Sequence, residues 1–225
     1  MLKDLFNRLS TTYDQDVIDC DNRGLFPFAG YQKVIDYIAE TINTRRDTST
    51  VSLLDLGIGT GYLSNKLYPE RLSICGIDQS EKMLEIASLK VPNANLYLFD
   101  FRVGLPEEIR YQKFDFIVST YAMHHLEENE FVEYLSFLIE RLNPFGKIII
   151  GDVLFQNHRE KEATRLANLK TWDDMEHYHV FDQILEKFKK NLSINFMKMS
   201  FCSGIIIIEK YHERTLQNCD VLVKY

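Results

Sequence analysis

The strongest constraint on the fold of this chain is a glycine-rich turn that follows a short apolar run. Residues 51–61 read Val-Ser-Leu-Leu-Asp-Leu-Gly-Ile-Gly-Thr-Gly, with glycine at three alternate positions. An apolar run of β-forming residues that ends in such a turn predicts a buried strand followed by a tight bend. Glycine is needed there because the backbone must adopt dihedral angles that a Cβ disfavours and because a ligand must approach the main chain. A helix is predicted near residues 62–67, with its N-terminal amides facing that ligand.

The spacing of the glycines separates two classes of ligand. A nicotinamide or flavin dinucleotide site uses G-x-G-x-x-G, in which the third glycine allows close packing of the helix on the strand. Gly57 and Gly59 fit that pattern, but position 62 is Tyr and the third glycine is Gly61. Asp55, two residues before the first glycine, would repel a pyrophosphate and attract a cation. The spacing therefore favours a ligand with a positive charge, and a strand-to-helix bend without any ligand is the structural alternative.

Length, charge and cysteine usage narrow the class of protein. A chain of 225 residues, 45% hydrophobic and 26% charged, suits one α/β domain with a substantial core. The net charge of -7 opposes attraction to phosphate backbones, so nucleic acid is a disfavoured partner. The cysteines are scattered without paired spacing, and neither a leader nor a membrane-spanning apolar stretch is found. These features predict a cytoplasmic protein with no membrane partner.

Two further strands are predicted to end in carboxylates. Residues 72–78 form a short apolar run that ends in Asp78, about 20 positions beyond the glycine turn, where a carboxylate can accept hydrogen bonds from ribose hydroxyls. Residues 95–101 end in Asp100 and Phe101. This pair suits an adenine, because the carboxylate can accept a hydrogen bond from the exocyclic amine. In the alternative interpretation, Asp100 only caps the turn that follows.

A fourth strand leads to the residues with the most reactive side chains. The run 114–120 predicts a buried strand that ends at Ser119 and Thr120. His124 and His125 follow it in the sequence. In open parallel sheets ligands lie at the carboxyl ends of the strands, so this segment should lie beside the glycine turn. Histidine titrates near neutral pH and can take a proton from an acceptor, whereas packing or helix capping is the alternative role for either residue.

The motifs between residues 51 and 154 resemble, in order and content, those of class I S-adenosylmethionine (SAM) methyltransferases. The first motif of that family is an acidic residue followed by G-x-G-x-G, and a Tyr-Asp pair precedes the core in many small-molecule members. Residues 119–126 and 151–155 are most similar to YrrT-like methyltransferases of Gram-positive bacteria. The resemblance implies SAM as the cofactor, held by Tyr13, Asp55, Gly57, Gly59, Gly61, Asp78, Gln79, Met83, Asp100, Phe101, Ser119 and Thr120. Without the resemblance, helical spacing assigns Met83 to the core, and Tyr13 is a packed residue of a polar loop.

The resemblance also implies the fold, a Rossmann-like α/β domain with a seven-stranded mixed sheet, helices on both faces and a terminal antiparallel hairpin. Within this single domain we expect residues 1–50 to form an N-terminal helical segment and flap, and 51–155 the SAM-binding core. Residues 156–191 should form a helical cover over the substrate, and 192–225 the hairpin and tail. Phe145 replaces the first glycine of the family's Leu-x-Pro-Gly-Gly turn, a difference expected to matter little for function.

The implied reaction is direct displacement of the methyl group of SAM by a small-molecule acceptor. A sulfonium is a good leaving group, so the protein mainly has to align the reactants and exclude water. His124 and His125 are the candidate bases, and their adjacent side chains diverge, so at most one should face the methyl group. His124 is favoured because it is nearer the end of the strand.

Several other functions are disfavoured. The chain lacks the Asn/Asp-Pro-Pro-Tyr motif of enzymes that methylate bases. His177 and His179 lie near a carboxylate in the sequence, but no second ligand cluster with zinc or iron spacing accompanies them, so no metal site is predicted. Two alternatives remain, a non-catalytic module that binds SAM or S-adenosylhomocysteine (SAH), and a nicotinamide-dependent oxidoreductase. Tyr62 in place of glycine disfavours the oxidoreductase.

Overall fold

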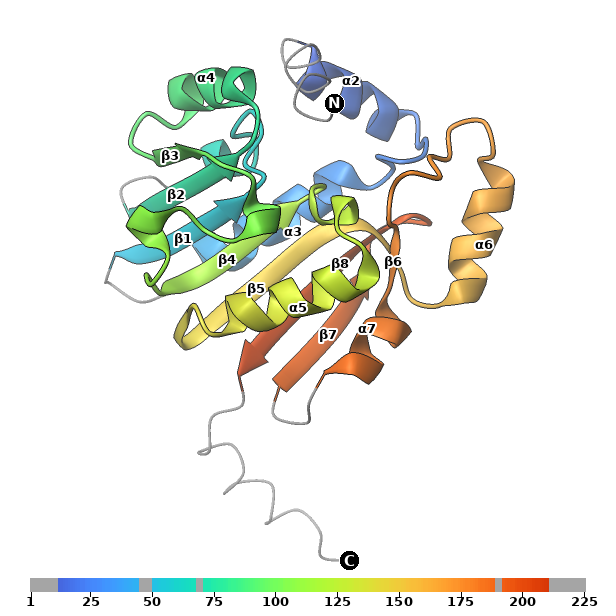
Figure 1. The fold of residues 1–225 in the computed structure, drawn as a ribbon. Coiled ribbons are helices and arrows are strands. Elements are labelled where there is room, and N and C mark those ends of the chain that lie inside the picture. Colours follow the sequence, from blue (N-terminus) through green and yellow to red (C-terminus); the bar gives the residue numbers. More distant parts are fainter. Residues whose placement is uncertain (1–11, 45–49, 68–70, 189–191, 211–225) are drawn as a thin grey trace, which may run out of the picture.

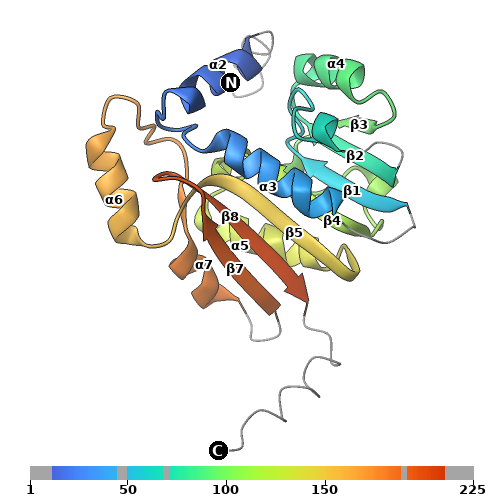
Figure 2. The ribbon, with the colours of Figure 1, turned by 180° about the vertical axis from the view of Figure 1, so that it is seen from behind.

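A single mixed sheet lies at the centre of the molecule (Figures 1 and 2). The computed structural model describes residues 12–44, 50–67, 71–188 and 192–210. The strands are β1 Val51–Leu56, β2 Leu72–Asp78, β3 Asn95–Leu98, β4 Phe114–Thr120, β5 Leu142–Phe155, β6 His179–Val180, β7 Leu192–Lys198 and β8 Ser203–Lys210. Seven of them follow the order β3-β2-β1-β4-β5-β8-β7, and the short β6 pairs with β5 outside this path.

The directions of the strands confirm the predicted Rossmann-like class I fold. Strands β1 to β5 run parallel to one another. β8 is antiparallel to β5, and β7 is antiparallel to β8, with Leu192 opposite Lys210, so the chain ends its sheet in the expected hairpin. The order reverses between β1 and β4, which lie side by side although they are far apart in sequence. Open α/β sheets bind their ligands outside the carboxyl ends of the strands at such a switch point.

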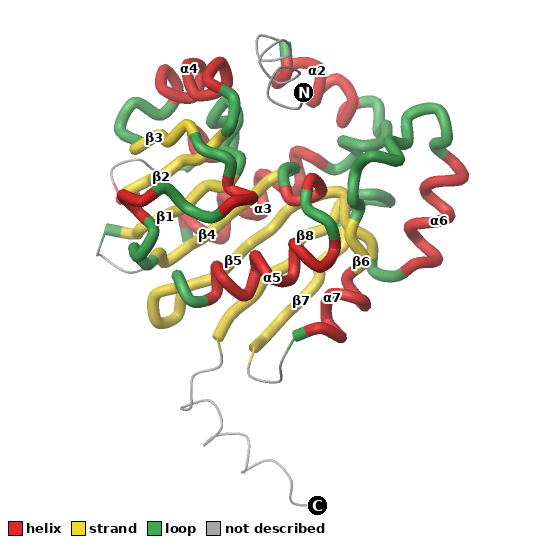
Figure 3. The backbone as a smooth tube through the Cα atoms, in the orientation of Figure 1, coloured by secondary structure: helices red, strands yellow, loops and turns green. Residues whose placement is uncertain are grey.

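Helices surround the layer of strands (Figure 3). The α-helices are α2 Tyr13–Asn22, α3 Tyr31–Asn43, α4 Glu81–Lys90, α5 Glu128–Ile139, α6 His158–Ala167 and α7 Phe181–Lys187. Short 3₁₀ turns are η1 Ser64–Lys66, η3 Phe101–Val103, η4 Glu107–Ile109 and η5 Met123–His125. Residues 1–11 of the predicted N-terminal segment and residues 211–225 of the predicted tail lie outside the described residues.

Two apolar layers hold the helices to opposite faces of the sheet. On one face α3 buries Val34, Ile35 and Ile38 completely, at the helical spacing seen in the sequence. This helix packs closely on β5, because a Cβ added to Gly151 would lie 2.1 Å from Cγ1 of Val34. On the other face α5 buries Phe131 and neighbouring leucines, and α7 joins the same layer. Figures 1 and 2 show α5 and α3 on these opposite sides.

The predicted helix over residues 62–67 is wrong in extent. Only one short 3₁₀ turn, η1, forms here, preceded by Leu63 in αR geometry, and Leu67 is already extended, with φ -86° and ψ 157°. The sequence has Pro69 two positions later, and a proline disfavours helical geometry in the chain before it. The glycine turn is therefore followed by a single short turn, not by a helix long enough to contribute a large dipole.

The turn at the start of β5 contains a strained residue. Phe145 has a left-handed φ of 65°, and its side chain is 72% exposed. A residue with a Cβ loses roughly 1–2 kcal/mol in this conformation, whereas glycine adopts it freely. This is the position at which the sequence carries Phe in place of a glycine.

We expect Phe145→Gly to raise the free energy of unfolding by about 0.5–1 kcal/mol, because the relief of strain exceeds the entropy that glycine adds to the unfolded chain. Urea unfolding followed by circular dichroism measures the change. Phe145→Ala is the matched control, since it removes the ring but keeps the Cβ, and it should give no such gain. Equal gains from both variants would show that the ring, not the backbone, is responsible.

Candidate functional site

The glycine turn has the backbone geometry that its sequence requires. Gly57, Gly59 and Gly61 all have left-handed φ values, of 71°, 55° and 76°. A Cβ at Gly57 would lie 2.5 Å from the Cβ of Ala122, which follows β4. The turn therefore brings bare main chain against the neighbouring strand end, and a side chain at Gly57 would fill this space.

Asp78, at the carboxyl end of β2, holds the turn in place. Its Oδ2 accepts a hydrogen bond of 2.9 Å from the Gly59 amide, and its Oδ1 accepts one of 2.8 Å from the Ser80 amide. Burial raises the pKa of this carboxyl, and the backbone amides partly offset the effect. A carboxylate has about four lone-pair directions, and the amides of Gly59, Ser80 and Gln79 use part of them. The side chain can accept a further hydrogen bond from a hydroxyl donor, and its role toward a ribose stays a prediction.

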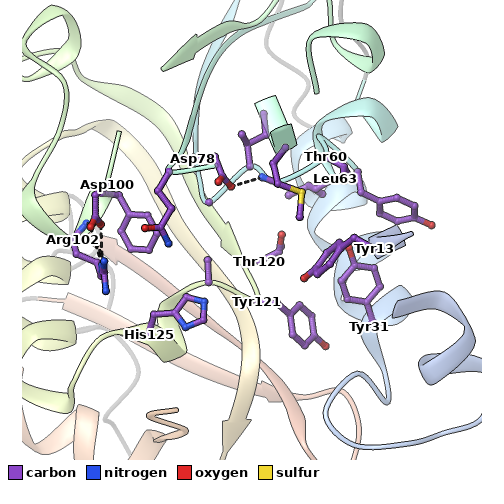
Figure 4. A pocket seen from close by; sticks show the side chains of 18 residues that line it. Tyr13, Tyr31, Thr60, Leu63, Asp78, Asp100, Arg102, Thr120, Tyr121 and His125 are labelled. Carbon is purple, nitrogen blue, oxygen red and sulfur yellow. Dashed lines mark hydrogen bonds and ion pairs between the residues drawn. The ribbon is translucent and has the colours of Figure 1, made fainter. Parts of the chain in front are cut away.

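A cavity opens over these residues, between the strand ends and α2 (Figure 4). Ten of the predicted site residues line it: Tyr13, Gly57, Gly59, Asp78, Gln79, Met83, Asp100, Phe101, Thr120 and His125. The sequence analysis did not assign eight further lining residues to the site: Tyr31, Ile58, Thr60, Tyr62, Leu63, Arg102, Tyr121 and Ala122. Most of these eight are immediate neighbours of predicted residues, which is the signal that would have found them. We call this space the first chamber.

The two ends of the first chamber differ in chemistry. At one end Asp100 faces Arg102, with Nη2 of the guanidinium 2.7 Å from Oδ2 and Nε 2.9 Å from Oδ1 (Figure 4). Hydrogen bonds from Arg102 lower the pKa of Asp100, so this carboxyl is ionised at neutral pH. Its Oδ1 also accepts from the Arg102 amide, so Asp100 caps η3, as the alternative interpretation proposed, while it lines the cavity.

Aromatic rings gather at the opposite end. The rings of Tyr31 and Tyr121 lie 5.0 Å apart, and Tyr62 lies 5.7 Å from Tyr31. Tyr121 has a left-handed φ of 51°, which is rare for a residue with a side chain, and Tyr121 OH lies 3.0 Å from Oγ of Ser203. This strained backbone after β4 directs the ring into the cavity (Figure 4).

Helix α2 is attached to the glycine turn through Asp14. Oγ1 of Thr60 donates to Oδ1 of Asp14 at 2.6 Å, and Nζ of Lys90 on α4 forms an ion pair with Oδ2. These contacts place the neighbouring Tyr13 on the cavity wall, where burial raises its pKa and keeps the phenol neutral. The Tyr-Asp pair therefore joins the N-terminal segment to the turn that the sequence identified.

Three of the residues predicted to hold the cofactor do not line the first chamber. Asp55 is 1% exposed beneath the turn, its Oδ2 accepts a 2.7 Å hydrogen bond from Ser64, and burial raises its pKa to about 7. Within the described part of the chain, Oδ1 of Asp55 has no hydrogen-bond partner. Gly61 faces Ala87 of α4, so its missing side chain serves helix packing. Ser119 donates through Oγ to the Leu56 carbonyl at 2.8 Å and links β4 to β1.

A second chamber adjoins the first. It is lined by Tyr13, Asp16, Val17, Cys20, Pro27, Phe28, Tyr121, His124, His125, Val153, Thr171, Asp173, Glu176 and Tyr178. Tyr13, Tyr121 and His125 line both chambers and form the wall between them. Residues 171–178 of the predicted cover region contribute four of the lining residues, and we call them the cover segment. A molecule in either chamber would therefore contact these three side chains.

His124 is oriented by a buried carboxylate. Nδ1 of His124 lies 2.6 Å from Oδ1 of Asp152 on β5, and Oδ2 of Asp152 accepts from the amides of Met123 and His124 at 2.9 and 3.2 Å. Burial opposes a charged imidazole, but Asp152 and then Glu176 outweigh it and raise the pKa of His124 above its ordinary value. The sequence analysis did not identify Asp152 as a site residue, and the structure places it inside β5, three residues before the end of the strand at Phe155.

His125 has a different partner. Its Nδ1 lies 2.8 Å from Oε2 of Glu176, and the same oxygen is 3.9 Å from Nε2 of His124. The hydrogen bond from His125, with the nearby histidines, lowers the pKa of Glu176 in spite of its burial. Among the described residues, His124, His125 and Glu176 form a group whose ligand atoms lie close enough together to hold a metal ion.

The two histidines of the cover region have structural contacts. His179 is buried, stacks on Phe131 with ring centroids 4.1 Å apart, and has Nε2 3.2 Å from the Met123 carbonyl. Burial lowers its pKa to about 4, so this histidine is neutral. The amide of His177 donates to the His124 carbonyl at 2.8 Å and fixes the cover segment beside η5. Neither residue belongs to the set formed by His124, His125 and Glu176.

Comparison with known proteins gives matches over most of the chain. A family profile described as a methyltransferase domain matches residues 53–146. A protein from Alkaliphilus oremlandii described as an uncharacterized methyltransferase is 31% identical over 85% of this chain and 88% of its own length. The uncharacterized methyltransferase YrrT from Halobacillus halophilus is 28% identical over 92% of this chain and 96% of its own.

The fold also has solved counterparts. Magnesium protoporphyrin IX methyltransferase from Synechocystis PCC 6803, crystallised with bound SAH, has a TM-score of 0.68 at 18% identity and covers 93% of this chain and 98% of its own. Other neighbours were crystallised with SAM or SAH, the predicted cofactor and its demethylated product. Among the described residues, no helix combines the length and the apolar character that crossing a membrane requires.

We expect Asp78→Ala to weaken SAM binding by about 1–3 kcal/mol, because it removes a charged acceptor and releases the Gly59 amide. Isothermal titration calorimetry on the folded variant measures the change. Asp36→Ala is a control on an exposed carboxylate of α3 that lines neither chamber, and it should leave the dissociation constant unchanged. An unchanged constant for Asp78→Ala would remove this residue from the site.

Proposed function

This chain belongs to the class I methyltransferase family, and from that premise we propose that it transfers the methyl group of SAM to a small-molecule acceptor by direct displacement. The observation that carries the proposal is the common wall of Tyr13, Tyr121 and His125 between the two chambers. A donor in the first chamber and an acceptor in the second would both contact these three side chains, so the two reactants would lie next to each other. The net charge of -7 and the cover over the second chamber favour a small acceptor over a nucleic acid.

The residues of the first chamber suit SAM. Bound SAM supplies a methyl group on a sulfonium, which is electrophilic without further activation. Asp78 would hold the ribose and Asp100 the adenine amine, with Met83 and Gln79 beside the adenosine. The left-handed glycines suit this role because Gly57 and Gly59 line the first chamber with main chain, and a Cβ at Gly57 would clash with Ala122.

Aromatic packing keeps the second chamber in shape and limits its water. Trp172 stacks on Phe26 with ring centroids 5.3 Å apart, and its ring centroid lies 4.6 Å from that of Tyr178. The cover segment therefore packs on the residues between α2 and α3. Tyr13 from α2 closes the chamber from the side of the first chamber. Because displacement needs alignment and a dry site, these contacts supply much of what the reaction requires from the protein.

His124 is the group we propose as the general base. Its Nδ1 is engaged by Asp152, which leaves Nε2 as the nitrogen that can take a proton in the second chamber. A base held by a buried carboxylate is the arrangement in which an imidazole keeps one tautomer and one orientation. Asp152 acts here as a positioning residue, since it contacts the histidine and does not line either chamber.

Two measurements test the proposed function. Calorimetry with SAM and with SAH should show binding to the first chamber, and incubation of SAM with a pool of small metabolites should release SAH. Failure of both ligands to bind the folded protein would overturn the proposal. Binding without methyl transfer to any acceptor would identify the chain as a non-catalytic SAM-binding module instead.

We expect His124→Asn to lower the turnover number by roughly 10²-fold or more, with SAM affinity nearly unchanged, because the variant removes a proton acceptor and not a cofactor contact. Steady-state kinetics and calorimetry measure the two quantities. His125→Asn is the matched comparison, and a loss of turnover in that variant alone would identify His125 as the base. Equal losses of SAM affinity and rate in His124→Asn would indicate a structural role.

The pH dependence of the turnover number should reflect the protonation of His124. The imidazole accepts a proton only when it is neutral, and the raised pKa keeps it protonated to a higher pH than a free histidine. The groups that face it are Asp152 on β5, Glu176 and Asp173 of the cover segment, and His125 beside it. Turnover should therefore rise with pH through an apparent pKa above 6.5. A rate that is independent of pH between 5 and 9, roughly the range over which His titrates, would argue against a base at this position.

A further inference from the structure

We propose that the second chamber selects a cationic amine, so that the methyl acceptor is an amine nitrogen. This inference rests on the proposed function and specifies its substrate. The observation behind it is a chamber wall that combines carboxylates with aromatic faces.

Apart from the two histidines, the ionisable side chains that favour a charge at neutral pH on this wall are all carboxylates. Asp16 from α2, with Asp173 and Glu176 from the cover segment, contribute carboxylates, and no lysine or arginine is among the described residues that line the chamber. Lys161 lies outside the lining and donates from Nζ to the Tyr178 carbonyl at 2.6 Å. Carboxylates that line a cavity attract a cation and repel an anion.

Glu176 is the carboxylate placed closest to the reaction. Its side chain is 20% exposed, and its Oε2 lies 2.8 Å from Nδ1 of His125, which lines both chambers, and 3.9 Å from Nε2 of His124. The contact with His125 keeps the carboxyl ionised at neutral pH. Asp16 and Asp173 are more exposed, so they can attract a cation toward the chamber while Glu176 binds it inside.

Aromatic rings complete the recognition of a cation. Phe28, Tyr121 and Tyr178 line the chamber, and the rings of Phe28 and Tyr121 lie 5.5 Å apart. The face of an aromatic ring attracts an ammonium group, and the attraction grows when the site is shielded from water. Carboxylate and phosphate acceptors would meet only repulsion from Glu176 and its neighbours, and neutral alcohols would leave these charges uncompensated.

The chemistry balances with the residues present. An ammonium acceptor gives one proton to Nε2 of His124, which frees the nitrogen lone pair. The nitrogen then forms a bond to the methyl carbon while the carbon–sulfur bond of SAM breaks, and the electron pair of that bond stays on sulfur. The products are an N-methylammonium ion and SAH, and the proton on His124 passes to water when the products leave.

A divalent metal ion is the competing ligand for the same side chains. His124, His125 and Glu176 offer ligand atoms within 4.8 Å of one another. Asp152 also holds Nδ1 of His124, as carboxylates in many metal sites hold the ring nitrogen of a histidine that does not bind the metal. The amine is favoured because Nδ1 of His125, which a metal ion would need as a ligand, is already engaged by Glu176 at 2.8 Å, and because aromatic rings line the same chamber as the carboxylates. The experiment separates the two ligands.

Calorimetry with SAH comes first, because it tests the proposed function without any acceptor. The protein is then incubated with SAM labelled with carbon-13 in the methyl group and with a low-molecular-mass bacterial extract, and the products are examined by NMR. We expect an N-methyl signal that disappears when the amines of the extract are acetylated beforehand. An O-methyl or S-methyl signal would overturn the amine assignment and leave the proposed function intact. No product from a protein that binds SAH would overturn both.

Variants test the role of charge. Glu176→Gln keeps the shape and the hydrogen-bonding capacity toward His125, and we expect it to raise KM for the acceptor by roughly tenfold, as for the loss of one charged hydrogen bond, with SAH affinity unchanged. Asp174→Asn is the matched control, because this neighbouring carboxylate is exposed and lines neither chamber. Equal KM values for Glu176→Gln and the unaltered protein would overturn the proposal. So would loss of turnover with EDTA that Mn²⁺ restores, since the carboxylate would then serve a metal ion.

Discussion

The site depends on one carboxylate that joins two strand ends. Asp78, at the end of β2, accepts hydrogen bonds from the amide of Gly59 after β1 and from the amide of Ser80 before α4. The left-handed glycines supply the turn, but this side chain fixes where the turn lies. Because the contacts exist within the protein itself, the cofactor chamber is formed before any ligand arrives, and little binding energy has to be spent on ordering it.

A second buried carboxylate does for the acceptor side what Asp78 does for the cofactor side. Asp152, at 0% exposure, holds the backbone of η5 and the ring of His124 at once. Its contact with His124 lowers its own pKa despite burial, so the charge persists at neutral pH. The two halves of the site are thus built on β2 and β5, on either side of β1 and β4, and Tyr121, in its strained conformation after β4, lines both chambers.

The sequence predicted the parts of the site that are local in the chain. The sheet, the glycine turn and Asp78 could be inferred because their signals are spacings within short segments. The contacts of His124 with Asp152 and of His125 with Glu176 join residues 28 and 51 positions apart, and only the packing of β5 and the cover segment brings them together. A sequence motif also does not show which of its residues are buried. Asp55 matched the family pattern, yet it lies beneath the turn with a raised pKa.

Trp172 is the only tryptophan in the chain, and its place in the cover segment gives it a use beyond packing. Its indole lies against Phe26 and Tyr178, so it touches both the N-terminal part of the molecule and the wall of the second chamber. Any displacement of the cover segment changes the surroundings of this one ring. All tryptophan fluorescence of the unlabelled protein therefore comes from this one position beside the second chamber. Its emission can follow opening and closing of the chamber in real time.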